Sequence, residues 1–321
     1  MTWRRRVRAF FFPAESDRWL TALRIGLGLV IVFYTWSLRA DWKYLFAGTG
    51  GGLVSRQLFE GLLSTQSWLI PRLGWLIWIG QRFGLDEGFA LSLGWFLLFF
   101  AGCLLLLGLF SRPAAVLAWF LQLAAAKSGG LLSYGADNFI TIGLFYLMIA
   151  PSPDRWALDA RRQKKRKPDP HLIGFFRRVL QIHLCFIYFF GGLTKCLGAG
   201  WWDGSNIWRA LTSQPFDVVP IRLVASWGAI LPALGISVCL LETSYALLIW
   251  PRWSRRVVLW SVCAMHIAIG LFMGMYLFAL IMLVLNIAAF GVSDRRREES
   301  REPGEMTQTQ IARQSAPQWR A

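Results

Sequence analysis

The sequence predicts an all-α integral membrane protein, a polytopic bundle of about eight transmembrane helices, and three observations carry this prediction. Hydrophobic residues make up 55% of the 321-residue chain and charged residues only 16%, well below the roughly 25% of soluble domains. Long apolar segments follow one another along the chain. The 34 Lys and Arg residues, against 18 Asp and Glu, cluster between those segments, which is typical of membrane proteins. We therefore expect a lipid bilayer as partner and no nucleic acid.

Eight segments are long enough to form the bundle, because a hydrocarbon core about 30 Å thick requires about 20 apolar residues in a helix. They cover residues 19–38, 89–110, 113–132, 133–150, 174–196, 228–250, 255–273 and 275–292. The third and fourth are interrupted by Lys127, Asp137 and several glycines. Six spans with a re-entrant pair are therefore the alternative, and both counts predict the same topology.

The basic clusters predict the orientation. Every second connection is basic: Arg4–Arg8, Arg112, "RRQKKRKPDP" (161–170), "PRWSRR" (251–256) and "DRRREESR" (294–301). By the positive-inside rule these connections face the cytoplasm. We expect a bacterial inner-membrane protein with both termini in the cytoplasm, and we expect the basic start of the chain to precede an uncleaved first transmembrane helix rather than a signal peptide.

The same pattern divides the chain into segments. A basic N-terminus (1–18) precedes the transmembrane domain (19–293), which contains an outer loop (39–88) and a cytoplasmic loop (151–173). Residues 294–321 are polar without hydrophobic periodicity, which predicts a disordered cytoplasmic tail. In the outer loop, "SWLIPRLGWLIWIG" (67–80) is too short to span, so it forms either an interfacial helix anchored by tryptophans or a loop packed over the bundle.

Ionisable residues inside apolar segments are the candidate functional groups, because a charge in lipid is costly without a partner. Arg24 either snorkels to the interface or pairs with an acid across the bundle. Glu242 lies near mid-span, where a carboxylate serves either a structural pair or a function. His183 and His266 can bond across helices, bind haem or move protons. No metal site is expected, because neither these histidines nor the five dispersed cysteines have ligand spacing.

Lys195, in "YFFGGLTKCLGAGWWDG" (188–204), is the most informative of these residues. It lies near the outer end of its helix, so one interpretation is a lysine that reaches the headgroups. Turn glycines, Trp201, Trp202 and Asp203 follow it and suggest a folded cap over the helix end. A covered lysine is desolvated, which favours the neutral amine and therefore a base. His183 precedes it by twelve residues, about 18 Å of helix, so the two do not form a simple dyad.

Five stretches, in order along the chain from about Trp19 to Phe290, form a recognisable series. They are "ALRIGLGLVIVFYT", "FAGTGGGLVSRQ", "YGADNFITIGLFYLMIAPSPDRWALDA", "LQIHLCFIYFFGGLTKCLGAGWWDGSNIWRAL" and "LLETSYALLIWPR". This series resembles the horizontally transferred transmembrane (HTTM) domain family, which is similar to the membrane part of vitamin K-dependent γ-glutamyl carboxylase.

The resemblance implies a role for Lys195, because in the carboxylase a lysine at the matching place deprotonates reduced vitamin K. A quinone-linked membrane oxidoreductase or modifying enzyme is therefore expected, with Lys195 as base and His183 and Glu242 orienting or relaying protons. Trp201 and Trp202 would cap a reduced quinone. Thr194 stands where the carboxylase has a second lysine, and only a short tail follows Phe290, so peptide carboxylation itself is not expected.

Two other function classes remain open at this point. The first is a non-enzymatic membrane factor that assists the maturation or export of a secreted peptide, and it would bind that peptide or a membrane partner. The second is a small-solute or proton transporter that uses Arg24, Glu242 and His266, although the sequence shows no inverted repeat.

Overall fold

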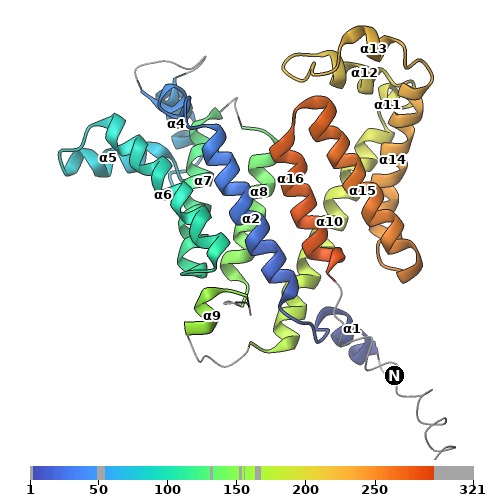
Figure 1. Cartoon of the computed structure of the whole chain (residues 1–321), viewed down its shortest axis with the longest axis horizontal. Coiled ribbons are helices and arrows are strands. Elements are labelled where there is room, and N and C mark those ends of the chain that lie inside the picture. The colour runs from blue at the N-terminus through green and yellow to red at the C-terminus, as the bar shows by residue number, and fades with distance from the viewer. Residues whose placement is uncertain are drawn as a thin grey trace, which may run out of the picture.

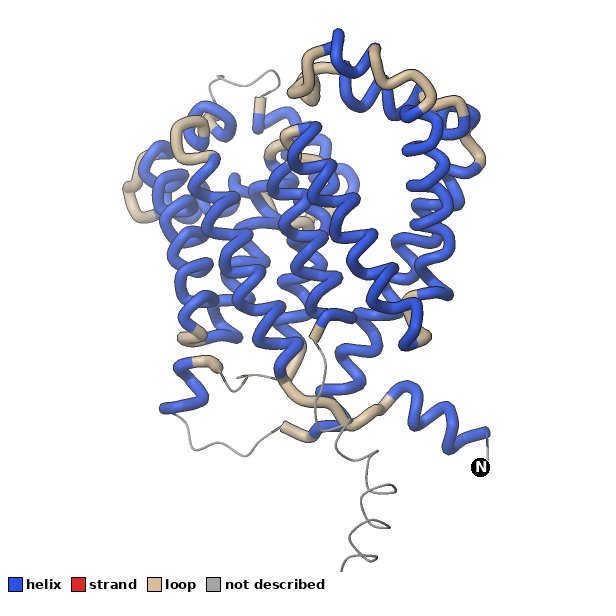
Figure 2. Tube along the Cα trace, turned by 45° about the vertical axis from the view of Figure 1, so that its right-hand side comes forward, coloured by secondary structure: helices blue, strands red, loops and turns tan. Residues whose placement is uncertain are grey.

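The described part of the chain is entirely helical in its regular structure. A computed structural model describes residues 3–48, 55–130, 133–151, 154, 156–162 and 168–292. Within these ranges Figure 2 shows helices joined by loops and no strand. The eight predicted segments correspond to α2 (Arg18–Ser37), α6 (Glu87–Leu107), α7 (Ser111–Ser128), α8 (Gly135–Ile149), α10 (Pro170–Cys196), α14 (Ile230–Leu248), α15 (Arg252–Met273) and α16 (Tyr276–Asn286) with the π-helix η2 (Ile287–Gly291).

Five of these helices are long and apolar enough to cross a membrane: α2, α6, α10, α14 and α15. Two others, α8 and the continuous α16–η2, are apolar but shorter. The remaining helix, α7, begins beside Arg112 and ends beside Lys127, with Gln122 buried between them. The all-helical class is thus confirmed. Which helices cross the bilayer is taken up under Proposed function.

The bundle has two distinct ends (Figure 1). At one, the α1 end, lie α1 (Trp3–Phe11), α9 (Leu158–Arg162), the start of α10 and the end of η2. At the other, the cap end, lie α4 (Arg56–Gln66) and the short helices α11 (Ala199–Trp202), α12 (Ser205–Thr212) and α13 (Ile221–Ala225). The terminal segment 294–321 and residues 163–167 of the basic stretch 161–170 lie outside the described residues.

The main hydrophobic core surrounds α2, because one face of that helix meets α6, α8 and α16–η2. Trp19, Leu23, Leu27 and Ile31 on this face are 0% exposed. Their spacing of three or four residues puts them on one side of a helix. Many large apolar side chains on the outer faces are exposed instead, including Phe33, at 50%. An exposed apolar surface around a well-packed interior is what a bilayer solvent favours.

Arg24 is paired rather than snorkelling. Its side chain is 1% exposed, and its Nε donates to Asp154 Oδ2 at 2.6 Å. Its Nη1 donates to the carbonyl oxygens of Leu105 and Leu106 at the end of α6. Thr21 supplies a further hydrogen bond to Asp154. Every charge is compensated, so this cluster is a structural tie between α2, α6 and the segment after α8.

The outer loop contains α3 (Trp42–Phe46), α4 and α5 (Leu73–Arg82). Residues 73–82 therefore form a helix, with Leu73 and Ile77 buried against the bundle. It begins later than the predicted stretch 67–80, because Arg72, which precedes it, has extended geometry. A buried network that links Arg56 to Glu60 at 2.9 Å and to Glu87 at 2.8 Å holds the loop in place.

The segment after α10 forms a compact cap, made of α11, α12 and α13, which lies over α14 and α15 at the cap end of the bundle (Figure 1). The cap has its own small hydrophobic core of Leu211, Val219 and Val224, separate from the main core. The predicted cap over the end of α10 is therefore a folded unit.

Candidate functional site

The central feature of the site is an ion pair between Lys195 and Glu242. Lys195 lies in the last turn of α10, and Glu242 lies in the middle of α14. The lysine Nζ donates to Glu242 Oε2 across the two helices. The sequence named both residues as candidates, and the structure brings them together. Each charge neutralises the other, which offsets the free-energy cost of placing either one alone in an apolar helix.

The two side chains meet because α10 and α14 approach each other closely at Gly192. A Cβ atom placed on Gly192 would lie 2.5 Å from the backbone nitrogen of Thr243 and 2.6 Å from its Oγ1. No residue other than glycine fits there without separating the helices. Cys196 Sγ, one turn further on, lies 3.5 Å from Thr243 Oγ1. The glycine thus sets the distance at which Lys195 and Glu242 meet.

The cap covers Lys195 from one side. The Lys195 ammonium lies 5.4 Å from the ring centroid of Trp201, a cation–π distance. Gly235 of α14 holds α11 in place, since a Cβ there would lie 2.1 Å from the Trp201 carbonyl oxygen. Trp202 differs, because its ring is 45% exposed and its Nε1 donates to the Cys196 carbonyl oxygen at 2.8 Å. Only Trp201 of the predicted pair faces the lysine.

Asp203 closes the turn between α11 and α12. Its Oδ1 accepts a hydrogen bond from the Ser205 backbone N–H at 2.8 Å. This hydrogen bond lowers the pKa of the Asp203 carboxyl from its ordinary value, so the turn is held by a carboxylate at neutral pH. The exposed carboxylate takes no part in the ion pair and serves the cap alone.

The ion pair is covered but not sealed. The Lys195 side chain retains 27% of its exposure and that of Glu242 10%. The Lys195 side chain is thus covered in part and accessible in part. Gly191 lies beside the pair, and a Cβ there would meet Glu242 Oε2 at 3.5 Å and Lys195 Nζ at 3.9 Å.

His183 does not join this pair. Its Nδ1 lies 3.0 Å from the hydroxyl of Tyr146 in α8, whereas Lys195 meets α14. The twelve residues between them put the two side chains at different depths and on different sides of α10, as the sequence predicted. His183 and Lys195 thus have different hydrogen-bond partners, and no direct contact between them supports the hypothesis that His183 orients or relays protons for Lys195.

A buried polar network lies deeper between α10, α14, α15 and α16. The hydroxyl of Tyr188 lies 2.8 Å from His266 Nε2 and accepts from Asn286 Nδ2 at 2.7 Å. Asn286 Oδ1 in turn accepts from the Tyr245 hydroxyl at 2.8 Å. His266 is 3% exposed, and its Nδ1 has no partner among the described residues. The network joins four helices through groups that hydrogen-bond well in a dry interior.

Of these four residues, the sequence analysis named only His266. Tyr188 precedes Lys195 by seven residues, which puts both on one face of α10. Asn286 is a lone amide in the apolar stretch "IMLVLNIAAF", and such a residue indicates a buried hydrogen bond. The seven-residue spacing of Tyr188 from Lys195 and the lone amide of Asn286 are both visible in the sequence and could have predicted these residues.

The chain matches no family model, no curated protein and no solved structure. The resemblance to the HTTM family therefore stays a prediction, and the site has to be interpreted from its own chemistry. That chemistry is a partly open ammonium–carboxylate pair under an aromatic ring, backed by a dry polar network.

Proposed function

We propose that the chain is an HTTM-like membrane protein whose Lys195–Glu242 pair takes a proton from a lipid-soluble hydroxyl substrate of the hydroquinone class. The observation that carries this proposal is the geometry of the pair. Two opposite charges from different helices meet, with the Trp201 ring centroid 5.4 Å from the Lys195 ammonium and 27% of the Lys195 side chain left exposed. The exposed part of the lysine is where a substrate hydroxyl would approach the pair.

The membrane topology supports this placement of the site. We propose that all eight main helices cross the bilayer, since α7 and α8 pack against each other and against the long helices α6 and α2. Among the described residues, the basic segment of α1, the start of α7 and the turn between α14 and α15 lie at the α1 end, which by the positive-inside rule is cytoplasmic. Lys195 then lies near the outer surface of an inner membrane, where a lipid-soluble substrate approaches sideways through the hydrocarbon.

In the proposed step, the substrate hydroxyl approaches the open side of the pair. Its proton passes to the pair, where the Glu242 carboxylate is the acceptor if Lys195 carries the ammonium. The resulting substrate oxyanion is held against the Lys195 ammonium, and electrostatic stabilisation of this kind is worth most in a water-poor site. Trp201 offers an aromatic face to a flat substrate ring.

The alternative is a non-enzymatic membrane factor for a secreted peptide or a membrane partner. In that case the ion pair only fixes α10 to α14, and the cap is a docking element. The two functions differ in what the loss of the Lys195 charge does. In the proposed step the ammonium is needed for turnover because it stabilises the substrate oxyanion, whereas a tie between helices is needed only for stability.

Turnover of a reduced naphthoquinone under oxygen tests the proposal on the purified full-length protein. Lys195→Ala and Lys195→Met should each abolish turnover, and Glu242→Gln should lower it by about 10²- to 10⁴-fold, the usual contribution of a positioned proton-transfer group. Lys127→Met is the matched control, because it removes an exposed lysine from the end of α7.

Thermal unfolding of each variant separates chemistry from stability. The proposal requires variants that remain folded and lose turnover. Wild-type protein that leaves the quinol unchanged, or Lys195 variants that turn over at the wild-type rate, would exclude it. Copurification of a peptide or membrane protein with both Lys195 variants would support the non-enzymatic alternative.

A further inference from the structure

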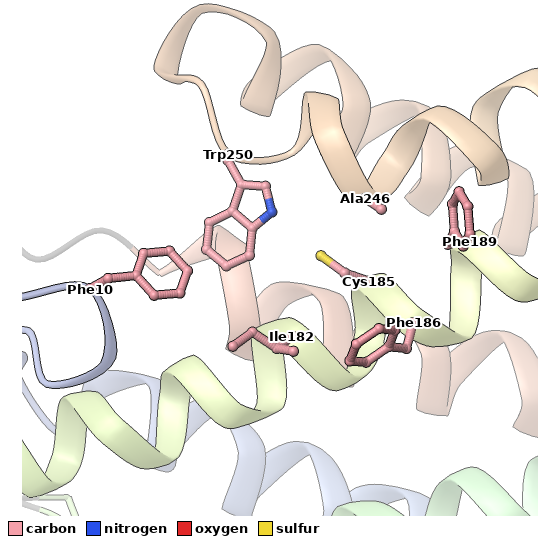
Figure 3. Close-up of a pocket in the computed structure, with 7 residues that line it drawn as sticks. All are labelled: Phe10, Ile182, Cys185, Phe186, Phe189, Ala246 and Trp250. Carbon is pink, nitrogen blue, oxygen red and sulfur yellow. The ribbon is translucent and has the colours of Figure 1, made fainter. Parts of the chain in front are cut away.

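An apolar groove runs along the outside of the bundle near the α1 end, away from Lys195. It encloses about 400 Å³, within the roughly 300–1,000 Å³ of ligand sites. Figure 3 shows its lining from three parts of the chain: α1, α10, and the end of α14 with the turn that follows. The lining residues are Phe10, Ile182, Cys185, Phe186, Phe189, Ala246 and Trp250.

Fixed positive charge borders one end of this groove. The Arg178 guanidinium lies 4.6 Å from the ring centroid of Phe10 and 4.9 Å from that of Trp250. Its Nε donates to the Phe10 carbonyl oxygen. Arg255 donates to the Trp250 carbonyl oxygen at 2.7 Å. Hydrogen bonds therefore fix two guanidinium groups beside two of the lining residues.

Exposed arginines occur within two residues of both Phe10 and Trp250 in sequence. Arg8 precedes Phe10 by two residues on α1, and Arg252 follows Trp250 by two residues. Both are exposed. The remaining exposed arginines of these two segments are Arg4, Arg5, Arg6 and Arg256. No acidic residue occurs in α1 or in α15, so the border has one sign.

The helix α1 has the composition of a helix that lies in the plane of a membrane surface. It carries four arginines and the aromatic residues Trp3, Phe10 and Phe11, and none of its residues is buried. Basic amphipathic helices of this kind bind anionic lipid surfaces. Trp253, 79% exposed at the start of α15, adds an indole at the same end of the bundle, as expected for an aromatic belt.

From these observations we infer that the groove and its arginine border form a binding site for an anionic phospholipid of the cytoplasmic leaflet. An acyl chain lies along Ile182, Phe186 and Ala246, where the lining is apolar. The phosphate lies at the Phe10–Trp250 end, where Arg8 and Arg252 reach it and Arg178 and Arg255 supply fixed charge. The site rests on the topology proposed above and is independent of any activity at Lys195.

The arginine border favours an anionic phospholipid over an uncharged or zwitterionic lipid. An uncharged or zwitterionic lipid fills the groove equally well but gains nothing from a border of one sign. Basic pockets between helices on the cytoplasmic side select anionic headgroups, at about 1 kcal/mol for each arginine near the surface. Selectivity for the headgroup is therefore the property to measure.

Native mass spectrometry of the delipidated full-length protein in detergent provides the test. The probes are phosphatidylglycerol and phosphatidylcholine with identical acyl chains, added together in equal amounts. We expect phosphatidylglycerol to be retained preferentially. The double variant Arg8→Ala/Arg252→Ala should lower that preference by about 30-fold, the effect of two such arginines. Arg39→Ala/Arg82→Ala, which removes two exposed arginines from other connections, should leave the preference unchanged.

A second pair of variants tests the groove itself. Ala246→Phe adds a ring inside the groove and should reduce the retention of phosphatidylglycerol, whereas Leu247→Phe adds the same ring on a neighbouring side chain that is 75% exposed and does not line the groove. Leu247 lies on an exposed face of α14, whereas Ala246 is partly buried against the main core, so thermal unfolding of both variants is measured beside lipid retention to show that each is folded. Equal retention of the two lipids, or equal effects of the two phenylalanine variants, would overturn the inference.

Discussion

Replacement of Gly192 by alanine should disrupt the Lys195–Glu242 site by forcing α10 away from α14. The added Cβ would lie 2.5 Å from the backbone nitrogen of Thr243, and ordinary contacts begin near 3.4 Å. The obstacle is backbone, so no side chain can rotate away, and the helices must separate by about 1 Å. Overpacking of this kind costs about 1–3 kcal/mol.

The neighbouring glycine provides the matched control. A Cβ on Gly191 would meet Glu242 Oε2 at 3.5 Å, an ordinary contact. Both substitutions gain the same helix propensity, about 1 kcal/mol relative to glycine. The difference in stability between Gly192→Ala and Gly191→Ala therefore isolates the clash.

Unfolding of the two variants in detergent, followed by heat or denaturant, measures this difference. Gly192→Ala should unfold more readily than Gly191→Ala by about 1–3 kcal/mol, and quinol turnover should fall in the same variant because the ion pair lengthens. Two variants of equal stability would refute the reasoning, since they would show that α10 and α14 do not depend on this contact.

Three further predictions concern other parts of the structure. Arg24→Met should cost about 3–5 kcal/mol in unfolding free energy, because it leaves the Asp154 carboxylate buried without its partner, and Arg24→Met/Asp154→Leu should recover most of that loss in the same measurement. Asn286→Leu should cost about 1–3 kcal/mol, because two buried tyrosine hydroxyls lose a partner; a smaller loss would mean that buried water replaces the amide. Gly235→Ala should displace α11, because its Cβ would lie 2.1 Å from the Trp201 carbonyl oxygen, and labelling of the lysine beneath it with an amine reagent should become faster.

The helices of the bundle follow from the sequence because apolar length and glycine or proline punctuation determine them locally. All eight predicted segments are helices, and their ends differ by a few residues. The largest differences are at the end of α7, which stops at Ser128 rather than 132, and at the start of α10. The helix α10 begins at Pro170 rather than near 174 because Asp169 caps it and proline suits the first turn. The short apolar helices α8 and α16 show where sequence alone leaves membrane crossing undecided.

The arrangement of the site was harder to predict, because it depends on the register between helices distant in sequence. Lys195 and Glu242 were both named, but nothing in the sequence pairs two residues 47 positions apart. The pairing follows from the contact of Gly192 with Thr243, which is a property of two packed surfaces. The choice between a snorkelling and a paired Arg24 depends on tertiary structure in the same way, because its partner Asp154 lies after α8, 130 positions away in the chain.

The separate hydrophobic core of the cap has a consequence for how the protein can diversify. Leu211, Val219 and Val224 pack mainly with one another and with the outer ends of α14 and α15. Insertions or exchanges between Gly198 and Pro220 would therefore remodel the roof above the lysine while the bundle keeps its own packing. The cap and the helical bundle can therefore change in sequence with little effect on each other's core.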